Sequence, residues 1–428
     1  MKYYSTNRKA PEVTLQEAVV RGLAPDKGLY MPERIKSLPQ TFFEHMPEMS
    51  LQEMAYQVAD AFFGEDVPAE KLRQIVYDTL SFDIPLVKVT EQIYSLELFH
   101  GPTLAFKDVG ARFMARLLAH FNKEKVNVLV ATSGDTGSAV ANGFLGVEGI
   151  HIYVLYPKGK VSRLQEAQFT TLGQNITAIE VEGTFDDCQA LVKNAFIDAE
   201  LNAHMKLTSA NSINVARFIP QSFYYFWAIA QLMKSSQSDA VICVPSGNFG
   251  NITSGLFGKR LGLPVKRFIA ANNRNDVFFR YLQNGFYDPH PTIATYANAM
   301  DVSDPSNFVR LFELYGSYDA IKEDISGATY TDEQITETIR QCYKDNGYLL
   351  DPHGACGYRA LQEGLQEGEV GIFLETAHPA KFKDRVDAIL GADIAIPEKL
   401  QAFMKGQKQT VPMANDFHAF KSYLLSES

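Results

Sequence analysis

The sequence lacks the signature motifs of several large enzyme classes. Neither the GxGxxG fingerprint of dinucleotide-binding folds nor the GxxxxGK[ST] loop of NTP-binding proteins occurs in its 428 residues. No two of the nine histidines are three or four residues apart, which excludes an HExxH-type zinc helix. These absences leave smaller phosphorylated compounds as the class of ligand to consider.

The chain has few cysteines, and its acidic residues outnumber its basic residues. The four cysteines show no paired short spacing and predict neither a disulfide framework nor a zinc ribbon. A formal net charge of -10 argues against nucleic acid or an anionic membrane as a partner, because both require a basic face. No run of about 18 apolar residues occurs, and the first residues, MKYYSTNRKAPEV, contain no apolar signal segment. We therefore expect a cytoplasmic protein without a metal ion.

The order of apolar patterns predicts the fold class. Apolar residues recur at helical spacing in 13–23 and 51–63, whereas short apolar runs rich in β-branched residues alternate with helical patterns after residue 125. The runs expected to form strands are 126–130, 151–156, 176–181, 240–244, 265–270 and 371–374. Such alternation indicates the α/β class, here two parallel-sheet α/β domains with a cleft between them.

A chain of this length is expected to form more than one domain. The expected division is an N-terminal helical extension (1–94), a smaller α/β domain (95–234) and a larger α/β domain (235–428). Residues 272–330 break the alternation and are interpreted as an insertion.

Three strand-to-helix junctions are rich in small polar residues. They are ATSGDTG (131–137), VPSGNFGN (244–251) and LETAHP (374–379). Backbone N–H groups at the start of a helix favour an anion, and a Gly-rich turn lets a phosphate approach them closely. The alternative for the first and third junctions is an ordinary helix cap, made by Ser133, Thr136 or Thr376.

Lys107 is the candidate reactive residue. It stands between the apolar segment FHGPTLAF and a helical pattern that begins near VGARFMARLL. A lysine in an apolar pocket is suited to form a Schiff base, although a lysine at a helix start is more often a solvated surface residue. The phosphate loop elsewhere in the chain favours the reactive role.

Four segments, in this order, resemble the threonine synthase family of tryptophan-synthase-like (fold type II) pyridoxal-phosphate enzymes: FHGPTLAFKD, ATSGDTG, SGNFGN and TAHPAKFK. SANSIN (209–214) and NAMDV (298–302) are also similar to that family. The resemblance implies pyridoxal 5'-phosphate as cofactor. It further implies conversion of O-phosphohomoserine and water to L-threonine and phosphate. We expect a monomer, with a small homo-oligomer as the alternative.

The resemblance also implies roles for individual residues. Lys107 forms the Schiff base with the cofactor, and Thr376 faces the pyridine nitrogen. Asp135 stands where many relatives have an asparagine that contacts the cofactor 3-hydroxyl. The residues expected around the cofactor phosphate are Gly247, Asn248, Phe249, Gly250 and Asn251, and those expected at the substrate are Ser133, Gly134, Thr136, Asn211 and Asn214. Cationic candidates for the substrate phosphate, chosen by residue type, are Lys158, Lys160, Arg163 and Arg217.

Two other functions fit the same motifs. A threonine or serine dehydratase would use the same lysine for β-elimination and release a 2-oxo acid and ammonia. A non-catalytic protein that binds a phosphorylated ligand would keep the loop and show no turnover.

Overall fold

The computed structural model describes residues 1–122, 124–235 and 239–427 and forms two compact units. Unit 1 consists of Met1, Met31–Phe106 and Phe218–Ala395, and unit 2 consists of Lys2–Tyr30, Lys107–Arg217 and Ile396–Ser428. This partition differs from the three consecutive segments expected from the sequence, because the chain crosses repeatedly between the units. The first 94 residues are shared between both units and do not form a separate one.

Unit 1 is built on a six-stranded sheet in the order β12-β11-β10-β13-β5-β4. Neighbouring strands are parallel, except that β4 runs antiparallel to β5. The strands are β4 (Leu86–Lys88), β5 (Ile93–Glu97), β10 (Ala240–Pro245), β11 (Arg267–Asn272), β12 (Ile325–Thr329) and β13 (Val370–Glu375). Every residue of β10 and β13 is buried, as is typical of parallel strands covered on both faces.

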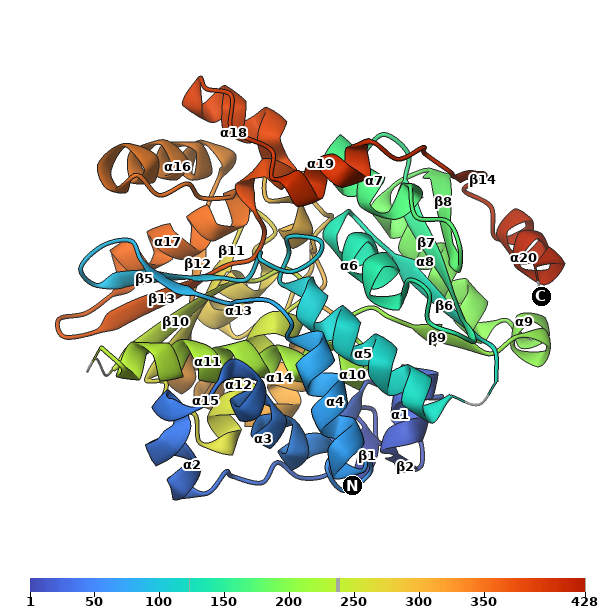
Figure 1. Ribbon diagram of the computed structural model, residues 1–428, viewed down its shortest axis with the longest axis horizontal. Helices are drawn as coiled ribbons and strands as arrows, with labels where there is room; N and C mark the ends of the chain where they lie inside the picture. Colours follow the sequence, from blue (N-terminus) through green and yellow to red (C-terminus); the bar gives the residue numbers. More distant parts are fainter. Residues whose placement is uncertain (123, 236–238, 428) are drawn as a thin grey trace. The chain divides into compact units, whose positions relative to one another are not determined.

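Helices cover this sheet. Helix α11 packs against α3 and α12, and α17 packs against β10 and β13 (Figure 1). The helices of unit 1 are α2 (Gln40–His45), η1 (Met46–Glu48), α3 (Leu51–Phe63), α4 (Ala69–Thr79), η2 (Ile219–Gln221), α11 (Ser222–Met233), α12 (Gly250–Leu261), α13 (Val277–Asn284), η3 (Asn298–Met300), α14 (Phe308–Tyr315), α15 (Tyr318–Asp324), α16 (Asp332–Asn346), α17 (Pro352–Gly364), η4 (Pro379–Phe382) and α18 (Lys383–Leu390).

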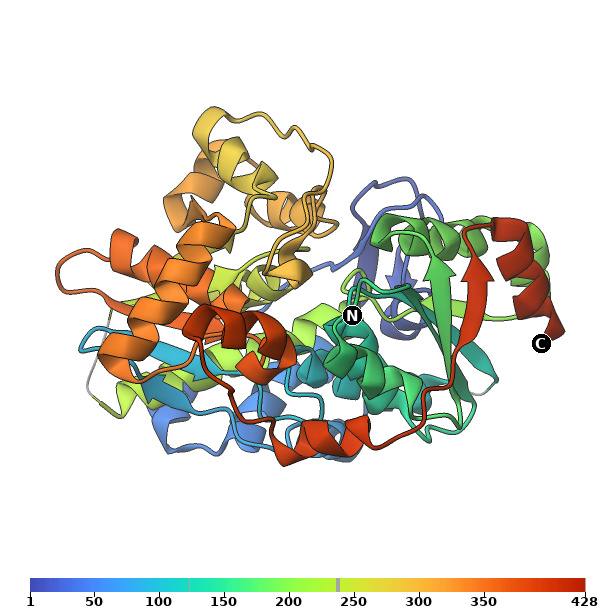
Figure 2. The same cartoon turned by 90° about the horizontal axis from the view of Figure 1, so that it is seen from above.

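Unit 2 contains a five-stranded, fully parallel sheet in the order β14-β8-β7-β6-β9. Its strands are β6 (Val126–Ala131), β7 (Ile150–Pro157), β8 (Ile176–Glu182), β9 (Leu207–Ser209) and β14 (Val411–Ala414). Its helices are α1 (Leu15–Arg21), α5 (Lys107–Phe121), α6 (Asp135–Phe144), α7 (Arg163–Thr170), α8 (Phe185–Ile197), α9 (Ala199–His204), α10 (Val215–Phe218), α19 (Glu398–Met404) and α20 (Phe417–Ser426). In Figure 2 the red strand β14 lies beside the green strand β8, so the end of the chain completes the sheet.

The α/β class and its parallel sheets are confirmed, and each of the six expected strands is present. The interpretation of 272–330 as an insertion that breaks the alternation is wrong. Strand β12 lies in this segment and pairs in parallel with β11, so the segment is a crossover that extends the sheet. The sequence also gave no sign of the small sheet in the order β2-β1-β3, formed by β1 (Lys2–Ser5), β2 (Val13–Thr14) and β3 (Tyr30–Pro32). Among the described residues, no helix is both long and apolar enough to span a bilayer.

The strand order of unit 1 gathers three of the expected loops at one edge. Strands β10, β13 and β5 are consecutive in the sheet and parallel, so their carboxyl ends lie along the same edge. The loops that leave these ends are 246–249, 376–378 and 98–106. Ligands of parallel α/β sheets bind at this edge.

A buried ion pair just before β13 affects stability. The Glu369 side chain is fully buried and accepts hydrogen bonds from Arg267 Nη2 at 2.6 Å and Nε at 3.1 Å. Lys266 Nζ lies 3.1 Å from the same carboxylate. These contacts, the Arg267 hydrogen bonds above all, lower the pKa of Glu369 from its usual 4.5 to about 2.

We therefore predict that Glu369→Gln lowers the free energy of unfolding at pH 7 by about 2–3 kcal/mol. A carboxylate with a depressed native pKa stabilises the fold above its unfolded pKa. The difference should therefore shrink as the pH falls from about 5 toward 2. Urea unfolding of wild type, Glu369→Gln and the exposed control Glu367→Gln at several pH values measures this. A difference that does not change with pH would contradict the assignment.

Candidate active site

The residues that precede Lys107 pair with the loop that contains Thr376. The Phe106 N–H donates to the Thr376 carbonyl at 2.8 Å, and the His378 N–H donates to the Leu104 carbonyl at 3.0 Å. Lys107 is bonded directly to Phe106 and is the first residue of α5. The expected Schiff-base lysine therefore directly follows a residue whose backbone N–H is hydrogen-bonded to the Thr376 carbonyl.

Buried polar side chains hold this pair of loops together. Lys381 is fully buried, and its Nζ donates to the Thr103 carbonyl at 2.7 Å. His378 Nδ1 accepts the Ala380 N–H at 3.1 Å and so caps η4. Burial, together with the charge of His100, lowers the pKa of His378 to about 4. His378 is therefore neutral at physiological pH, as its acceptor role requires.

Lys107 itself belongs to unit 2 and is half-buried. Its carbonyl accepts a hydrogen bond from Arg217 Nη1 at 3.4 Å, and Arg217 Nε donates to the Ala210 carbonyl at 2.8 Å. The buried Arg217 therefore joins the start of α5 to the SANSIN turn, a role that its residue type did not reveal. A Cβ at Gly110 would lie 2.3 Å from Arg217 Nη1, so a glycine is required beside it.

The loop after β10 leads through a left-handed residue into the first turn of α12, an arrangement that suits an anion. Phe249 adopts a left-handed conformation with a φ of 63°, and α12 begins at the next residue, Gly250. A Cβ at Gly247 would lie 2.6 Å from the Ala299 carbonyl oxygen and 2.9 Å from Met300 Cα. The loop is therefore packed against η3, which holds most of the NAMDV motif, and only glycine fits at position 247.

The first turn of α12 offers donors that suit a phosphate. Asn251 is buried, and its Oδ1 accepts hydrogen bonds from the Tyr224 hydroxyl at 2.6 Å and the Tyr225 hydroxyl at 2.7 Å. Its Nδ2 is buried and has no hydrogen-bond acceptor among the described residues. The first N–H groups of a helix have no acceptor within the helix, and the helix dipole favours an anion there. A phosphate group fits this donor set.

A buried chain of polar contacts supports both loops. Glu375 Oε1 accepts the Asp351 N–H at 2.6 Å, and Asp351 Oδ2 lies 2.5 Å from His353 Nδ1. His353 Nε2 accepts the N–H of Ala299, the residue that packs against Gly247. Burial, with a contribution from the Asp351 carboxylate, raises the pKa of Glu375 well above its usual value. The chain of contacts thus runs from the end of β13 to the loop after β10.

Unit 2 gathers the expected substrate residues at the carboxyl ends of β6 and β9, which are neighbours in its sheet. Thr132 Oγ1 accepts the N–H groups of Gly134 at 2.9 Å and Gly137 at 2.8 Å. The side chain that organises the start of α6 is therefore Thr132, whereas Ser133 and Thr136 are half-buried beside it. Sequence reasoning missed Thr132, which stands next to the two hydroxyl residues that it considered as caps.

Asp135 is held inside unit 2. It is buried, and its Oδ1 accepts from Gln165 Nε2 at 2.9 Å. A Cβ at Gly134 would lie 2.6 Å from the Gln165 amide nitrogen, so this contact depends on the glycine, whose φ of 145° also favours glycine.

The two asparagines of SANSIN have different surroundings. Asn211 is half-buried, and its Nδ2 donates to the Ala131 carbonyl at 3.1 Å, which ties the turn to the end of β6. Asn214 is fully buried, and its Nδ2 donates to the carbonyls of Val19 at 2.8 Å and Ser209 at 3.2 Å. These bonds use both amide hydrogens of Asn214, so its side chain has none left for a substrate. The basic candidates Lys158, Lys160 and Arg163 are exposed.

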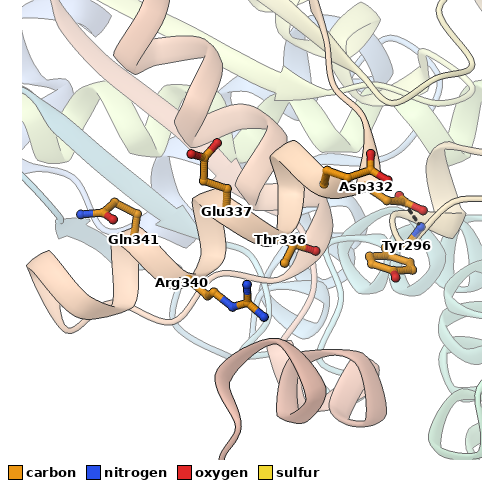
Figure 3. A pocket seen from close by; sticks show the side chains of 7 residues that line it. Tyr296, Asp332, Thr336, Glu337, Arg340 and Gln341 are labelled. Carbon is orange, nitrogen blue, oxygen red and sulfur yellow. Dashed lines mark hydrogen bonds between the residues drawn. The ribbon is translucent and has the colours of Figure 1, made fainter.

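A cavity of about 430 Å³ lies elsewhere in unit 1, along α16 (Figure 3). Its lining consists of Tyr296, Asp332, Glu333, Thr336, Glu337, Arg340 and Gln341. Three acidic side chains disfavour a phosphorylated ligand, and Asp332 already accepts the Tyr296 N–H at 3.0 Å. None of the expected site residues lines this cavity.

Comparison with known proteins identifies the family. Residues 83–375 match the family of pyridoxal-phosphate dependent enzymes, residues 2–80 match the threonine synthase N terminus, and residues 354–424 match the threonine synthase C-terminal family. Threonine synthase from Haemophilus influenzae is 46% identical over 99% of this chain and 100% of its own length.

Solved structures agree with this match. Threonine synthase from Escherichia coli superposes with a TM-score of 0.95 at 43% identity, over 100% of both chains. The pyridoxal-phosphate-bound threonine synthase from Brucella melitensis gives a TM-score of 0.94 at 35% identity, over 100% of this chain and 99% of that one. The chain therefore belongs to the threonine synthase family of pyridoxal-phosphate-dependent enzymes.

Proposed function

We propose that the protein converts O-phosphohomoserine and water to L-threonine and phosphate with pyridoxal 5'-phosphate as cofactor. The observation that carries this proposal is the edge of the unit 1 sheet. There the phosphate-type loop, the Thr376 loop and the segment that leads into Lys107 leave three neighbouring strands. A reactive lysine, a phosphate cradle and a hydroxyl for the ring nitrogen are the groups that this cofactor requires.

The residues of unit 1 fit the two ends of the cofactor. The loop of Gly247, Asn248, Phe249 and Gly250 would hold the phosphate through main-chain N–H groups. Asn251 Nδ2, which has no acceptor among the described residues, would add a side-chain donor. The Thr376 hydroxyl would contact the pyridine nitrogen, because a neutral hydroxyl can serve as donor or acceptor there. Its nearly buried position favours such a bond over one with water.

Lys107 would carry out the proton transfers. When bound, pyridoxal phosphate supplies an electron sink for negative charge that develops on the substrate carbons. Once the cofactor is bound, the Lys107 amine would hold it covalently between turnovers and, when freed by the substrate, would accept the proton from the substrate Cα. A Cβ proton would then be lost as phosphate leaves Cγ. A proton returned to Cγ would complete the methyl group, water would add its hydroxyl at Cβ, and a proton returned to Cα would give threonine. The bond from Arg217 to its carbonyl holds the main chain of Lys107 at the start of α5 and would limit the positions that the amine can reach.

Unit 2 would bind the amino-acid part of the substrate. We assign Ser133, Gly134, Thr136 and Asn211 to this role, with Asp135 near the cofactor 3-hydroxyl. The proximity of the β6 and β9 ends supports the grouping, and the bond between Asn211 and Ala131 joins the two turns. The Asn214 side chain would act indirectly by fixing the SANSIN turn on α1.

The substrate is a small molecule, and the net charge of -10 supports a reaction without nucleic acid or membrane as partner. We further propose a cytoplasmic location and a monomer, with a small homo-oligomer as the alternative.

The reaction is tested by incubating the protein with O-phosphohomoserine and cofactor. We expect equal amounts of phosphate and threonine to appear, because each turnover releases one of each. A 2-oxo acid with ammonia from threonine or serine would indicate the dehydratase instead. Binding of the phosphorylated ligand without any product would indicate a non-catalytic protein.

The role of Lys107 is tested by Lys107→Ala. The variant should lose the visible absorbance of the bound cofactor and nearly all turnover, by several orders of magnitude, because nucleophile and base are removed together. Lys125→Ala, which changes an exposed lysine just beyond α5, should retain both. Borohydride reduction of active wild type should attach the cofactor to the Lys107 peptide. Attachment at any other lysine would refute the assignment.

A further inference from the structure

Arg310 is a fully buried cation in unit 1. It lies in α14, which packs against α12, and its guanidinium sits 4.3 Å above the centre of the Phe218 ring. Burial lowers the pKa of Arg310 to about 9, so the side chain stays protonated at neutral pH. A buried charge is costly, and an arginine in such a place commonly serves an anion.

One side chain connects this cation to the phosphate-type loop. Arg310 Nη1 donates to Asn307 Oδ1 at 2.8 Å, and Asn307 Nδ2 donates to the Asn248 carbonyl at 3.1 Å. The Asn307 N–H also donates to this carbonyl, at 3.3 Å. Asn307 is fully buried and its bond with Arg310 forms away from water, whereas its side-chain bond with the half-buried Asn248 is partly buried. A cation on the oxygen of an amide strengthens the donor character of its nitrogen, because linked hydrogen bonds polarise one another.

These bonds also orient the loop. In a trans peptide the Asn248 carbonyl and the Phe249 N–H point in opposite directions. Because the carbonyl is directed at Asn307, the Phe249 N–H is directed away from Asn307. Asn248 is further fixed by the Ser306 N–H, which donates to its Oδ1 at 2.6 Å. A carbonyl that is held in this way cannot turn its negative end toward an anion at the start of α12.

We propose that Arg310 is the positioning residue of the phosphate site, acting through Asn307 on the 246–250 loop to favour a dianionic phosphate. The inference rests on the proposed function, in which this loop holds the cofactor phosphate. The dipole of α12 supplies about half a positive charge, whereas a phosphate monoester carries about -1.5 to -2 at pH 7. Arg310 supplies one full positive charge to the same buried region, where Coulomb interactions are weakly screened.

The experiment compares the affinities of pyridoxal 5'-phosphate and pyridoxal, which lacks the phosphate. Both are titrated into the full-length protein, from which cofactor has been removed, and followed by visible absorbance. In Arg310→Met the affinity for pyridoxal 5'-phosphate should fall about tenfold or more, equivalent to about 1.4 kcal/mol. The affinity for pyridoxal should stay unchanged. Arg280→Met, on the partly exposed arginine that pairs with Asp276 in the same crossover, is the matched control and should alter neither value.

A second variant keeps the test decisive if Arg310→Met does not fold. Asn307→Ala removes the link to the loop and should reduce the preference for the phosphorylated ligand in the same way. A purely structural Arg310 would lower both affinities equally, or neither, and that result would overturn the proposal. Failure of the proposed phosphate loop looks different, because Gly247→Val would then keep the wild-type preference. If Gly247→Val loses the preference while Arg310→Met or Asn307→Ala keeps it, only the role of Arg310 is refuted.

Discussion

The site depends on a short antiparallel contact between two loops of unit 1. The N–H of Phe106 and the carbonyl of Thr376, together with the N–H of His378 and the carbonyl of Leu104, join segments that lie far apart in the sequence. Lys107, the proposed Schiff-base residue, follows Phe106 directly and is therefore next in sequence to this contact. Parallel pairing of β5 with β13 brings the two loops to the same edge of the sheet, and the buried Lys381 keeps them there.

The proposed phosphate end of the site depends on a second set of constraints, one steric and one electrostatic. The 246–250 loop can keep its backbone conformation only with glycine at position 247, because η3 occupies the space that a Cβ would fill. The bonds from Asn307 direct the Asn248 carbonyl toward Asn307, which in our proposal keeps this carbonyl from facing the anion. Segments 298–300 and 306–310 therefore act as a support for the loop, even though they lie in what reads from the sequence as an insertion. The contact of His353 with Ala299 joins this support to the β13 end, so the two ends of the proposed cofactor site share one buried framework.

Local patterns in the sequence were sufficient to predict the strands and the Gly-rich loop, because both depend mainly on neighbouring residues. The buried strands carry short apolar runs that include β-branched residues, and the Gly-rich loop after β10 is recognisable from its composition. What the sequence could not reveal depends on long-range contacts. Arg217 and Arg310 have the residue type of solvent-exposed cations, and only the fold shows that both are buried. Thr132 could not be told from its hydroxyl neighbours without the geometry of its bonds to Gly134 and Gly137. Strand β12 was missed because a long helical crossover separates it from its partner β11.

The central claim is that the framework of unit 1 and Lys107 supports loss of phosphate from Cγ followed by addition of water at Cβ. The most direct test is turnover of O-phosphohomoserine in water labelled with oxygen-18, with both products analysed by mass spectrometry. The account predicts label in the hydroxyl group of threonine and none in the released phosphate, because the bond that breaks joins carbon to oxygen. Label in the phosphate, with homoserine as the other product, would show simple hydrolysis of the ester and would contradict the account.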